Sequence, residues 1–321
     1  MAKDGTALSI GFLMDPLERL LIHHDSTFAL MLEAQARGHR VFSFEQRHLS
    51  ATGAGARARM REVRVAREEG RHFQVVSEEL RPLTALDVLF LRKDPPVDVP
   101  FLHATQLVEL GAGGRPLLIN DPRGLRDANE KLFALRFPAL VPETLVSSDR
   151  VELREFIAAQ PAGAIVKPVD GFGGRAVVRM VAGDPNQNAL LELMTAEGTQ
   201  LVVAQRYLEA AAQGDERIIL LDGEPIGALL RVPRRGDLRC NLAVGGKAVK
   251  ARLGEREREL CAAIGPALRA HGLLLAGIDV IGGKLIEVNV TSPTGLVEID
   301  ALDGVRLEAE IIEFAERRVR G

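Results

Sequence analysis

Apolar and polar positions follow two rhythms along the first 120 residues. Short apolar runs predict buried strands at residues 7–14, 40–46, 87–92 and 116–120. Residues 26–38 show the apolar spacing of a helix, with Gly38 placed to end it. Strands separated by helices favour a parallel sheet with helices on its faces. We expect the charged, Gly- and Ala-rich segment 51–74 to form an exposed loop and a strand.

The pattern of the later chain predicts an α+β arrangement. A helix is expected from Asp127, whose side chain would cap it, with Glu130 at the capping-box position. Further helices are predicted at 152–159, 188–196, 256–270 and 307–319, and strands at 164–169, 175–181, 201–208, 216–223 and 227–233. Changes in composition predict three parts: an N-terminal α/β domain (1–122), a central lobe (123–200) and a C-terminal lobe (201–321).

Composition excludes several classes of protein. The net charge is −3 and the isoelectric point is near 6.2, so no basic surface for nucleic acid is indicated. No apolar run reaches the length needed to span a bilayer, and the N-terminus lacks the pattern of a signal peptide. Two cysteines, Cys240 and Cys261, are too few for a disulfide framework or a zinc cluster. We therefore expect a cytoplasmic protein.

A glycine-rich loop follows Lys167, and lysine is the less common of the two basic residues in this chain. Only seven of the 41 basic residues are lysines, and Lys167 precedes Gly171, Phe172, Gly173 and Gly174. The flanking segments alternate as strands do, so the loop differs from the strand-to-helix glycine loops of dinucleotide-binding folds and P-loops. Its N–H groups could close over phosphates, with Lys167 as the cation. A flexible hairpin turn with an exposed lysine explains the same pattern, and the residues alone leave both interpretations open.

An apolar hairpin over residues 277–290 carries three side chains with oxygen atoms: Asp279, Glu287 and Asn289. Glu287 and Asn289 are two positions apart and share a face, whereas the face of Asp279 depends on the turn at Gly282-Gly283. We predict a three-residue loop or an equivalent bulge that pairs Asp279 with Glu287. Two carboxylates in an apolar sheet need a cation, and an all-oxygen set suits Mg²⁺ or Mn²⁺. The alternative is a polar outer face, which the asparagine in a strand disfavours.

Two arginines lie within apolar strands. Arg217 and Arg231 would each need a partner if buried, and bidentate recognition of a carboxylate is the natural use. Arginines that face solvent from an edge strand remain the alternative. The segments MDP (14–16) and LRKDPP (91–96) end predicted strands, where open α/β folds bind ligands. No sequence signature of a covalent nucleophile is present.

Together these segments resemble the ATP-grasp superfamily, and within it the bacterial glutathione synthetases. The resemblance is carried, in order along nearly the whole chain, by MDP, HDSTFALMLEAQARG, LRKDPP, NDPRGLRDANEKLFA, VKPVDGFGG, GDERIILLDGEP, NLAVGG and GIDVIGGKLIEVNVTSPTG. It implies a pre-ATP-grasp α/β domain followed by a two-lobed ATP-grasp domain. It also implies an ATP-dependent ligase that joins γ-L-glutamyl-L-cysteine to glycine through an acyl phosphate.

The resemblance implies a role for each matched residue. Lys131 and Lys167 would bind ATP phosphates beneath the flap 171–174, Asp215 would lie near the ribose, and the adenine pocket would comprise Gln205, Arg206, Tyr207 and Leu208. Asp279, Glu287 and Asn289 would hold Mg²⁺ or Mn²⁺. Arg217 and Arg231 would hold substrate carboxylates and the acyl phosphate. The segment 232–247 would be a lid that excludes water. A homo-oligomer, commonly a tetramer, is also implied.

Three segments depart from the family pattern: the Arg-rich lid with Cys240, His24 in place of a common lysine, and residues 296–304. These positions concern the peptide and its acceptor more than ATP. The alternatives are therefore an ATP-grasp carboxylate–amine ligase with another substrate, or a nucleotide-binding regulator without catalysis. The retained lysines and oxygen ligands argue against the regulator.

Overall fold

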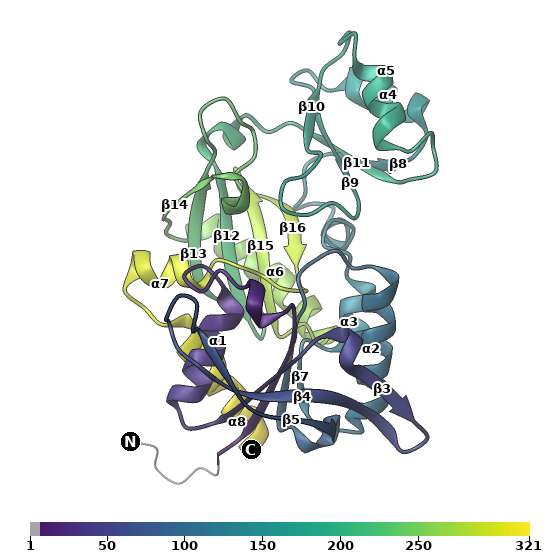
Figure 1. Cartoon of the computed structure of the whole chain (residues 1–321). Coiled ribbons are helices and arrows are strands. Elements are labelled where there is room, and N and C mark those ends of the chain that lie inside the picture. Colours follow the sequence, from purple (N-terminus) through teal and green to yellow (C-terminus); the bar gives the residue numbers. More distant parts are fainter. Residues whose placement is uncertain (1–6) are drawn as a thin grey trace.

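The structure is a computed structural model that describes residues 7–321. It contains sheets of seven, four and five strands, arranged with helices as a mixed α/β protein (Figure 1). This confirms the predicted fold class. In the first sheet β1 (Ser9–Met14) pairs in parallel with β2 (Arg40–Phe44) and β6 (Val88–Arg92), and β6 pairs in parallel with β7 (Leu117–Ile119). These are the four strands that the apolar runs predict.

Helices cover both faces of this sheet because alternate strand residues point to opposite sides. Leu13 and Leu89 belong to one hydrophobic cluster with Phe101 of α2 (Val99–Ala112). Phe12 and Phe90, one residue along, stack at 5.1 Å between ring centroids. They belong to a second cluster, with side chains of α1 (Ser26–Ala36) and of the C-terminal helix α8 (Leu307–Arg320).

The expectation of an exposed loop and a strand over residues 51–74 is confirmed only in part, because the segment belongs to a larger group of strands. Three antiparallel strands, β3 (Leu49–Thr52), β4 (Gly55–Val65) and β5 (Phe73–Pro82), extend the sheet beyond β2. In β4 small apolar residues alternate with arginines, and residues such as Ala58 and Met60 are buried while the arginines between them face outward. The high charge of β4 therefore lies on its exposed face.

The predicted helix from Asp127 is wrong. Helix α3 (Pro122–Asp127) ends there, and its N-cap is Asp121, which accepts from the N–H of Arg123 at 2.7 Å. The side chain of Asn129 then caps a turn by accepting from the N–H groups of Lys131 and Leu132, both at 3.1 Å. This irregular segment leads into the 3₁₀ turn η4 (Phe133–Arg136) and lies against β16.

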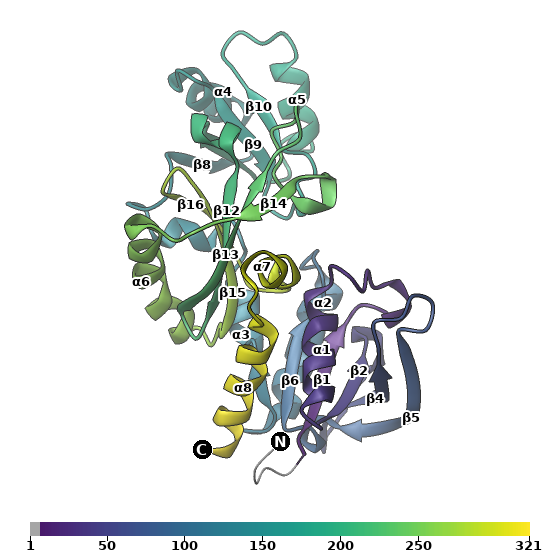
Figure 2. The same ribbon diagram turned by 90° about the vertical axis from the view of Figure 1, so that its left-hand side faces the viewer.

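The central lobe has a sheet and a core of its own. Its strand order is β10-β9-β11-β8, from β8 (Thr144–Ser147), β9 (Ala164–Pro168), β10 (Val178–Met180) and β11 (Val202–Arg206). Helices α4 (Arg150–Ala159) and α5 (Gln187–Met194) pack on it. The buried cluster of Leu153, Ile157, Val166, Leu191 and Val202 is separate from the two clusters of the other domains. This lobe forms one end of the molecule in Figures 1 and 2.

The C-terminal lobe is built on the third sheet, in the order β14-β13-β12-β15-β16. Its strands are β12 (Asp215–Leu221), β13 (Glu224–Val232), β14 (Lys247–Lys250), β15 (Leu275–Ile281) and β16 (Lys284–Asn289), and its helices are α6 (Glu255–Ala270) and α7 (Leu296–Asp303). The remaining 3₁₀ turns are η1 (Leu17–Arg19), η2 (Gln46–His48), η3 (Leu83–Ala85), η5 (Glu209–Gln213) and η6 (Leu242–Val244).

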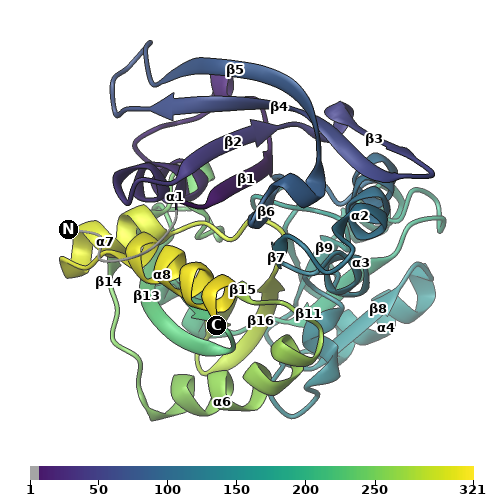
Figure 3. The ribbon, with the colours of Figure 1, turned by 90° about the horizontal axis from the view of Figure 1, so that it is seen from below.

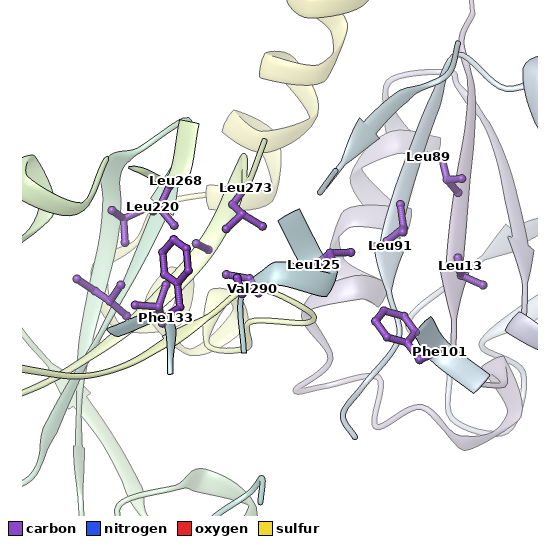
Figure 4. Packing of buried hydrophobic residues seen from close by; sticks show 14 of the residues in the cluster. Leu13, Leu89, Leu91, Phe101, Leu125, Phe133, Leu220, Leu268, Leu273 and Val290 are labelled. Carbon is purple, nitrogen blue, oxygen red and sulfur yellow. The ribbon is translucent and has the colours of Figure 1, made fainter. Parts of the chain in front are cut away.

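The N-terminal domain and the C-terminal lobe share a continuous core. Helix α8 returns from the C-terminal lobe to lie beside α1 (Figures 2 and 3). A close view shows Leu89 and Phe101 of the N-terminal domain on one side, Leu220 and Phe133 on the other, and Leu125 between them (Figure 4). Among residues 7–321 we find no helix with the length and apolar character of a transmembrane segment.

Candidate active site

A cavity of about 370 Å³ lies where the two lobes of the predicted ATP-grasp domain face each other. Asp94 and Pro95 bring the N-terminal domain to its wall, and residues 292–295 line it after β16. Every residue that the sequence assigned to the site lines this cavity: Lys131, Lys167, Gly171, Phe172, Gly173, Gly174, Gln205, Arg206, Tyr207, Leu208, Asp215, Arg217, Arg231, Asp279, Glu287 and Asn289.

The predicted register of the β15–β16 hairpin is confirmed in its bulged form. Only Gly282 and Gly283 connect the strands, since Ile281 pairs with Lys284. The register then shifts between Val280, which pairs with Leu285, and Asp279, which pairs with Glu287. One extra residue in β16 therefore turns Glu287 to the face of Asp279.

Asp279 lies between two buried arginines. Arg217 donates to both of its oxygens, from Nε at 2.5 Å and from Nη2 at 3.0 Å. Nη2 of Arg231 lies 2.9 Å from Oδ2 of Asp279, and Arg231 also forms a bidentate pair with Asp215 at 2.6 and 2.7 Å. Although burial opposes ionisation, the two arginines hold the pKa of Asp279 well below its usual range. The arginines are thus not exposed edge-strand residues.

Glu287 faces the two lysines. Its Oε1 is 3.0 Å from Nζ of Lys167 and 3.8 Å from Nζ of Lys131. Burial alone would raise the pKa of Glu287, but the lysines lower it below its ordinary value. Lys131 also donates to the carbonyls of Val169, at 3.3 Å, and Gly171. Both lysines are nearly fully buried and occupy the space between the glycine loop and the hairpin.

The glycine loop meets the predicted lid. Gly174 has a φ of +75°, and a Cβ added to it would lie 2.7 Å from Oδ1 of Asn241. The side chain of Arg239 is also close to Gly174, and both lid residues line the cavity. The segments 171–174 and 232–247 therefore both contribute residues to the cavity wall and touch each other.

The predicted adenine pocket lies at the end of β11. Gln205 donates to Oγ1 of Thr144 at 3.0 Å. Tyr207, the only tyrosine of the chain, is held by a hydrogen bond from its N–H to the carbonyl of Gly163 at 3.0 Å. The guanidinium of Arg179 lies 3.9 Å from the centre of the Tyr207 ring. This cation–π contact occupies one face of the Tyr207 ring.

Sequence reasoning assigned no site role to Glu130. Its carbonyl accepts from the N–H of Val288 at 2.8 Å, and the residue lines the cavity. Burial, followed by the charge of Glu287, raises the pKa of Glu130 to about 7. Its position directly before Lys131 was the only sequence signal, and the helix expected there gave Glu130 a capping role instead.

The two segments predicted to lie at the substrate site, 14–16 and 91–96, are in contact with each other. Lys93 lies 3.0 Å from Oδ1 of Asp15, and Oδ2 of Asp15 accepts from the N–H of Asp94 at 3.0 Å. These residues follow the neighbouring parallel strands β1 and β6, and among them Asp94 reaches the cavity. His24 is mostly exposed and pairs with Glu298 of α7 at 3.1 Å.

The oxygen set on the hairpin fits a hard divalent cation. Asp279, Glu287 and Asn289 share a face, and Nδ2 of Asn289 is 3.3 Å from Oδ2 of Asp279. Two carboxylates and an amide oxygen are ligands that Mg²⁺ and Mn²⁺ prefer. In residues 7–321 no group of three or more His, Cys, Asp or Glu side chains is placed to hold a metal ion.

Comparisons with known proteins cover nearly the whole chain. The family model described as prokaryotic glutathione synthetase, N-terminal domain, matches residues 8–126, and that described as prokaryotic glutathione synthetase, ATP-grasp domain, matches residues 130–304. Glutathione synthetase of Gloeobacter violaceus is 47% identical over 312 residues, which are 96% of this chain and 96% of that protein.

Two solved structures share the fold. D-cycloserine synthetase DcsG superposes with a TM-score of 0.67 at 18% identity, covering 97% of this chain and 100% of that chain. The ATP-grasp ligase PsnB, solved with a phosphomimetic variant of its minimal precursor, Mg and ADP, has a TM-score of 0.60 at 18% identity and covers 99% and 100%.

Proposed function

The chain belongs to the prokaryotic glutathione synthetase family, and we propose how the residues of its cavity carry out the reaction. The protein is an ATP-dependent ligase that joins γ-L-glutamyl-L-cysteine to glycine and releases ADP and phosphate. One observation supports the assignment of residues to roles: acidic and basic side chains face each other across one cavity. A hairpin with two carboxylates lies opposite Lys131, Lys167, Arg217 and Arg231 in one cavity.

The ATP end of the cavity is assigned to the lysines and the strand edge. Lys131 and Lys167 bind the phosphates, and the N–H groups of residues 171–174 close over them. Adenine lies against Gln205, Arg206, Tyr207 and Leu208, and Asp215 lies on the ribose side. The burial of both lysines supports this assignment, because a buried ammonium needs anionic partners and Glu287 is shared between the two.

The arginines handle the charge that moves during the reaction. An oxygen of the cysteinyl carboxylate attacks the γ-phosphorus of ATP and ADP leaves, which forms an acyl phosphate. The uncharged amine of glycine then attacks the carbonyl carbon, the C–O bond to phosphate breaks, and the amine loses a proton. Arg217 and Arg231 orient the carboxylate and stabilise the oxygens as they gain charge. No protein nucleophile takes part.

The hairpin residues Asp279, Glu287 and Asn289 would hold Mg²⁺ or Mn²⁺. When bound, such a cation neutralises phosphate charge and orients the phosphoryl group. Support comes from the donor chemistry on the hairpin and from the Mg and ADP named in the PsnB complex of the same fold. A cation held by Asp279 and Glu287 would release the lysines and arginines that pair with them here, and these could then pair with phosphates.

Water must be excluded because it would hydrolyse the acyl phosphate. We assign this role to the lid 232–247 and the loop 171–174, which touch at Gly174 and Asn241. The division into residues 1–122, 123–200 and 201–321 is part of the proposal, and the separate core of the central lobe supports it. A cytoplasmic homo-oligomer, in the form of a tetramer, completes it. The two buried, unpaired cysteines support the cytoplasmic assignment.

Transfer of an isotope tests the acyl phosphate directly. The dipeptide is prepared with ¹⁸O in its cysteinyl carboxylate and incubated with ATP, Mg²⁺ and glycine. One labelled oxygen is expected in the released phosphate, because the carboxylate oxygen that attacks phosphorus leaves with it. A reaction without glycine serves as the control. Unlabelled phosphate from a reaction that makes glutathione would contradict the acyl phosphate.

A further inference from the structure

A buried arginine connects the N-terminal sheet to the loop that follows β16. Arg92 ends β6 and is 3% exposed. Its Nε donates to Oγ1 of Thr27 in α1 at 3.1 Å, and its Nη2 donates to the carbonyl of Pro293 at 2.9 Å. Its Nη1 is buried and finds no hydrogen-bond partner among residues 7–321. Burial lowers the pKa of Arg92, and the charges of Asp25 and Asp94 oppose that shift.

This arrangement is poorly suited to stability alone. An unsatisfied N–H on a buried guanidinium destabilises the fold, and the charge of the group increases that cost. An apolar side chain of similar size would avoid that cost. Features that break a stability rule in this way concentrate at functional sites. The two satisfied hydrogen bonds of Arg92 indicate where the function lies, since one of them reaches a cavity-lining residue, Pro293.

The loop 292–295 encloses Arg217. Nη1 of Arg217 donates to the carbonyl of Thr294 at 3.2 Å. A Cβ added to Gly277 would lie 3.1 Å from Cβ of Pro293 and 3.2 Å from Cδ of Arg217, so the three residues are packed closely. A Cβ added to Gly295 would lie 3.6 Å from Cγ of Arg217. A shift of this loop would therefore move the Arg217 side chain.

We propose that Arg92 is a positioning residue that holds Arg217 in its reactive orientation through the consecutive carbonyls of Pro293 and Thr294. One carbonyl accepts from Arg92 of the N-terminal domain, and the next accepts from Arg217 of the C-terminal lobe. Arg217 in turn donates hydrogen bonds to both carboxylate oxygens of Asp279 in the hairpin. The N-terminal domain thus sets the geometry of a catalytic side chain that belongs to the C-terminal lobe. The inference rests on the proposed role of Arg217.

The test separates positioning from binding and from stability. Arg92→Met and Arg92→Lys are compared with the wild type by kcat for ADP release with the dipeptide and glycine, and by the Kd of ADP. We expect kcat of Arg92→Met to fall about tenfold or more, because small displacements of catalytic groups are costly. The Kd of ADP should change by less than about twofold, since Arg92 is not among the described residues that line the cavity. Arg92→Lys keeps donors for both oxygens and should recover part of kcat.

Arg37→Met is the matched control. Arg37 also joins the N-terminal domain to the C-terminal part of the chain, through Glu316 at 2.9 Å and the carbonyl of Ala309 at 3.2 Å, but it is remote from the loop. This variant should lower the Tm and leave kcat unchanged. If kcat stays within about twofold of the wild type in every folded Arg92 variant, or falls equally in Arg37→Met, the inference is overturned. A wild type without glycine-dependent ADP release would instead refute the proposed function.

Discussion

Asp279 lies directly opposite Glu287 on the β15–β16 hairpin, although only two glycines connect the strands. A two-residue loop with regular pairing would put these carboxylates on opposite faces of the sheet. The bulge beside Ile286 removes that mismatch. A backbone irregularity of one residue therefore brings together the carboxylates to which we assign the metal.

Glu287→Gln tests the metal assignment. The amide keeps the size of the side chain but loses the charge that pairs with Lys167 and binds a divalent cation. We expect ADP release to fall by about a hundredfold or more, with no recovery at high Mg²⁺ concentration. Glu259→Gln, an exposed carboxylate on α6, is the control and should behave as the wild type. Turnover of Glu287→Gln within about threefold of normal would refute its role.

Lys167→Met tests the phosphate site without the need for turnover. Tyr207 is the single tyrosine and the chain has no tryptophan, so tyrosine fluorescence reports from the cavity. Loss of a buried ammonium should weaken ADP binding by about tenfold or more, which is about 1.4 kcal/mol. Lys284→Met, at the hairpin turn, removes a lysine from outside the cavity and should leave the Kd unchanged. Equal affinities in both variants would show that Lys167 does not bind phosphate.

The strands around the site could be predicted because their signal is local. The alternation on either side of residues 171–174 is enough to place the glycine loop between two strands, now β9 and β10. In the hairpin, the chemical demand for convergent oxygens predicted a bulge that turn length alone would not. The family resemblance then supplied the residue roles, which physical patterns left open.

The failures have physical causes. Arginines between the buried residues of β4 raised the charge of that strand and hid its period of two. At 127–137, good helix formers are overridden by the Asn129 cap and by pairing of Glu130 with β16. The ion pairs of Arg217 with Asp279 and of Arg231 with Asp215 depend on strand neighbours within the third sheet. The spacing of residues along the chain does not predict these ion pairs.

Two adjacent glycines test the contact between the loop and the lid. Gly173 and Gly174 both have positive φ, so alanine at either position costs about 1–2 kcal/mol of local strain. A Cβ at Gly173 meets nothing within 4 Å, whereas one at Gly174 meets Asn241 at 2.7 Å. We expect Gly174→Ala to lower kcat about tenfold and Gly173→Ala about threefold or less. Equal kcat values would mean that the two segments do not meet during turnover.

The junction of α7 and α8 predicts a pH dependence of stability. Burial and a hydrogen bond to Glu308 raise the pKa of Asp300 from its ordinary value to about 7. The folded chain therefore holds a proton there that the unfolded chain releases at lower pH. The resulting contribution to stability is full below the unfolded pKa, declines as pH rises, and is gone above about pH 7.

Asp300→Asn reproduces the protonated carboxyl at every pH. Its oxygen can still accept from the N–H of Leu307, as Oδ1 of Asp300 does at 2.8 Å, and its amide can donate to Glu308. Urea unfolding is measured at pH 5 and pH 8. The wild type should lose stability relative to Asp300→Asn between the two values, whereas Glu310→Gln, an exposed control on α8, should follow the wild type. If the difference in free energy of unfolding between the wild type and Asp300→Asn were the same at both pH values, Asp300 would not hold a proton in the folded chain.

The most direct test of the account is ADP release by the purified protein with ATP, Mg²⁺, γ-L-glutamyl-L-cysteine and glycine, each omitted in turn, with the product identified by mass spectrometry. We predict one glutathione for each ADP, and loss of glutathione when any component is omitted. ADP release that does not depend on glycine, or a complete mixture that yields no glutathione, would contradict the central claim.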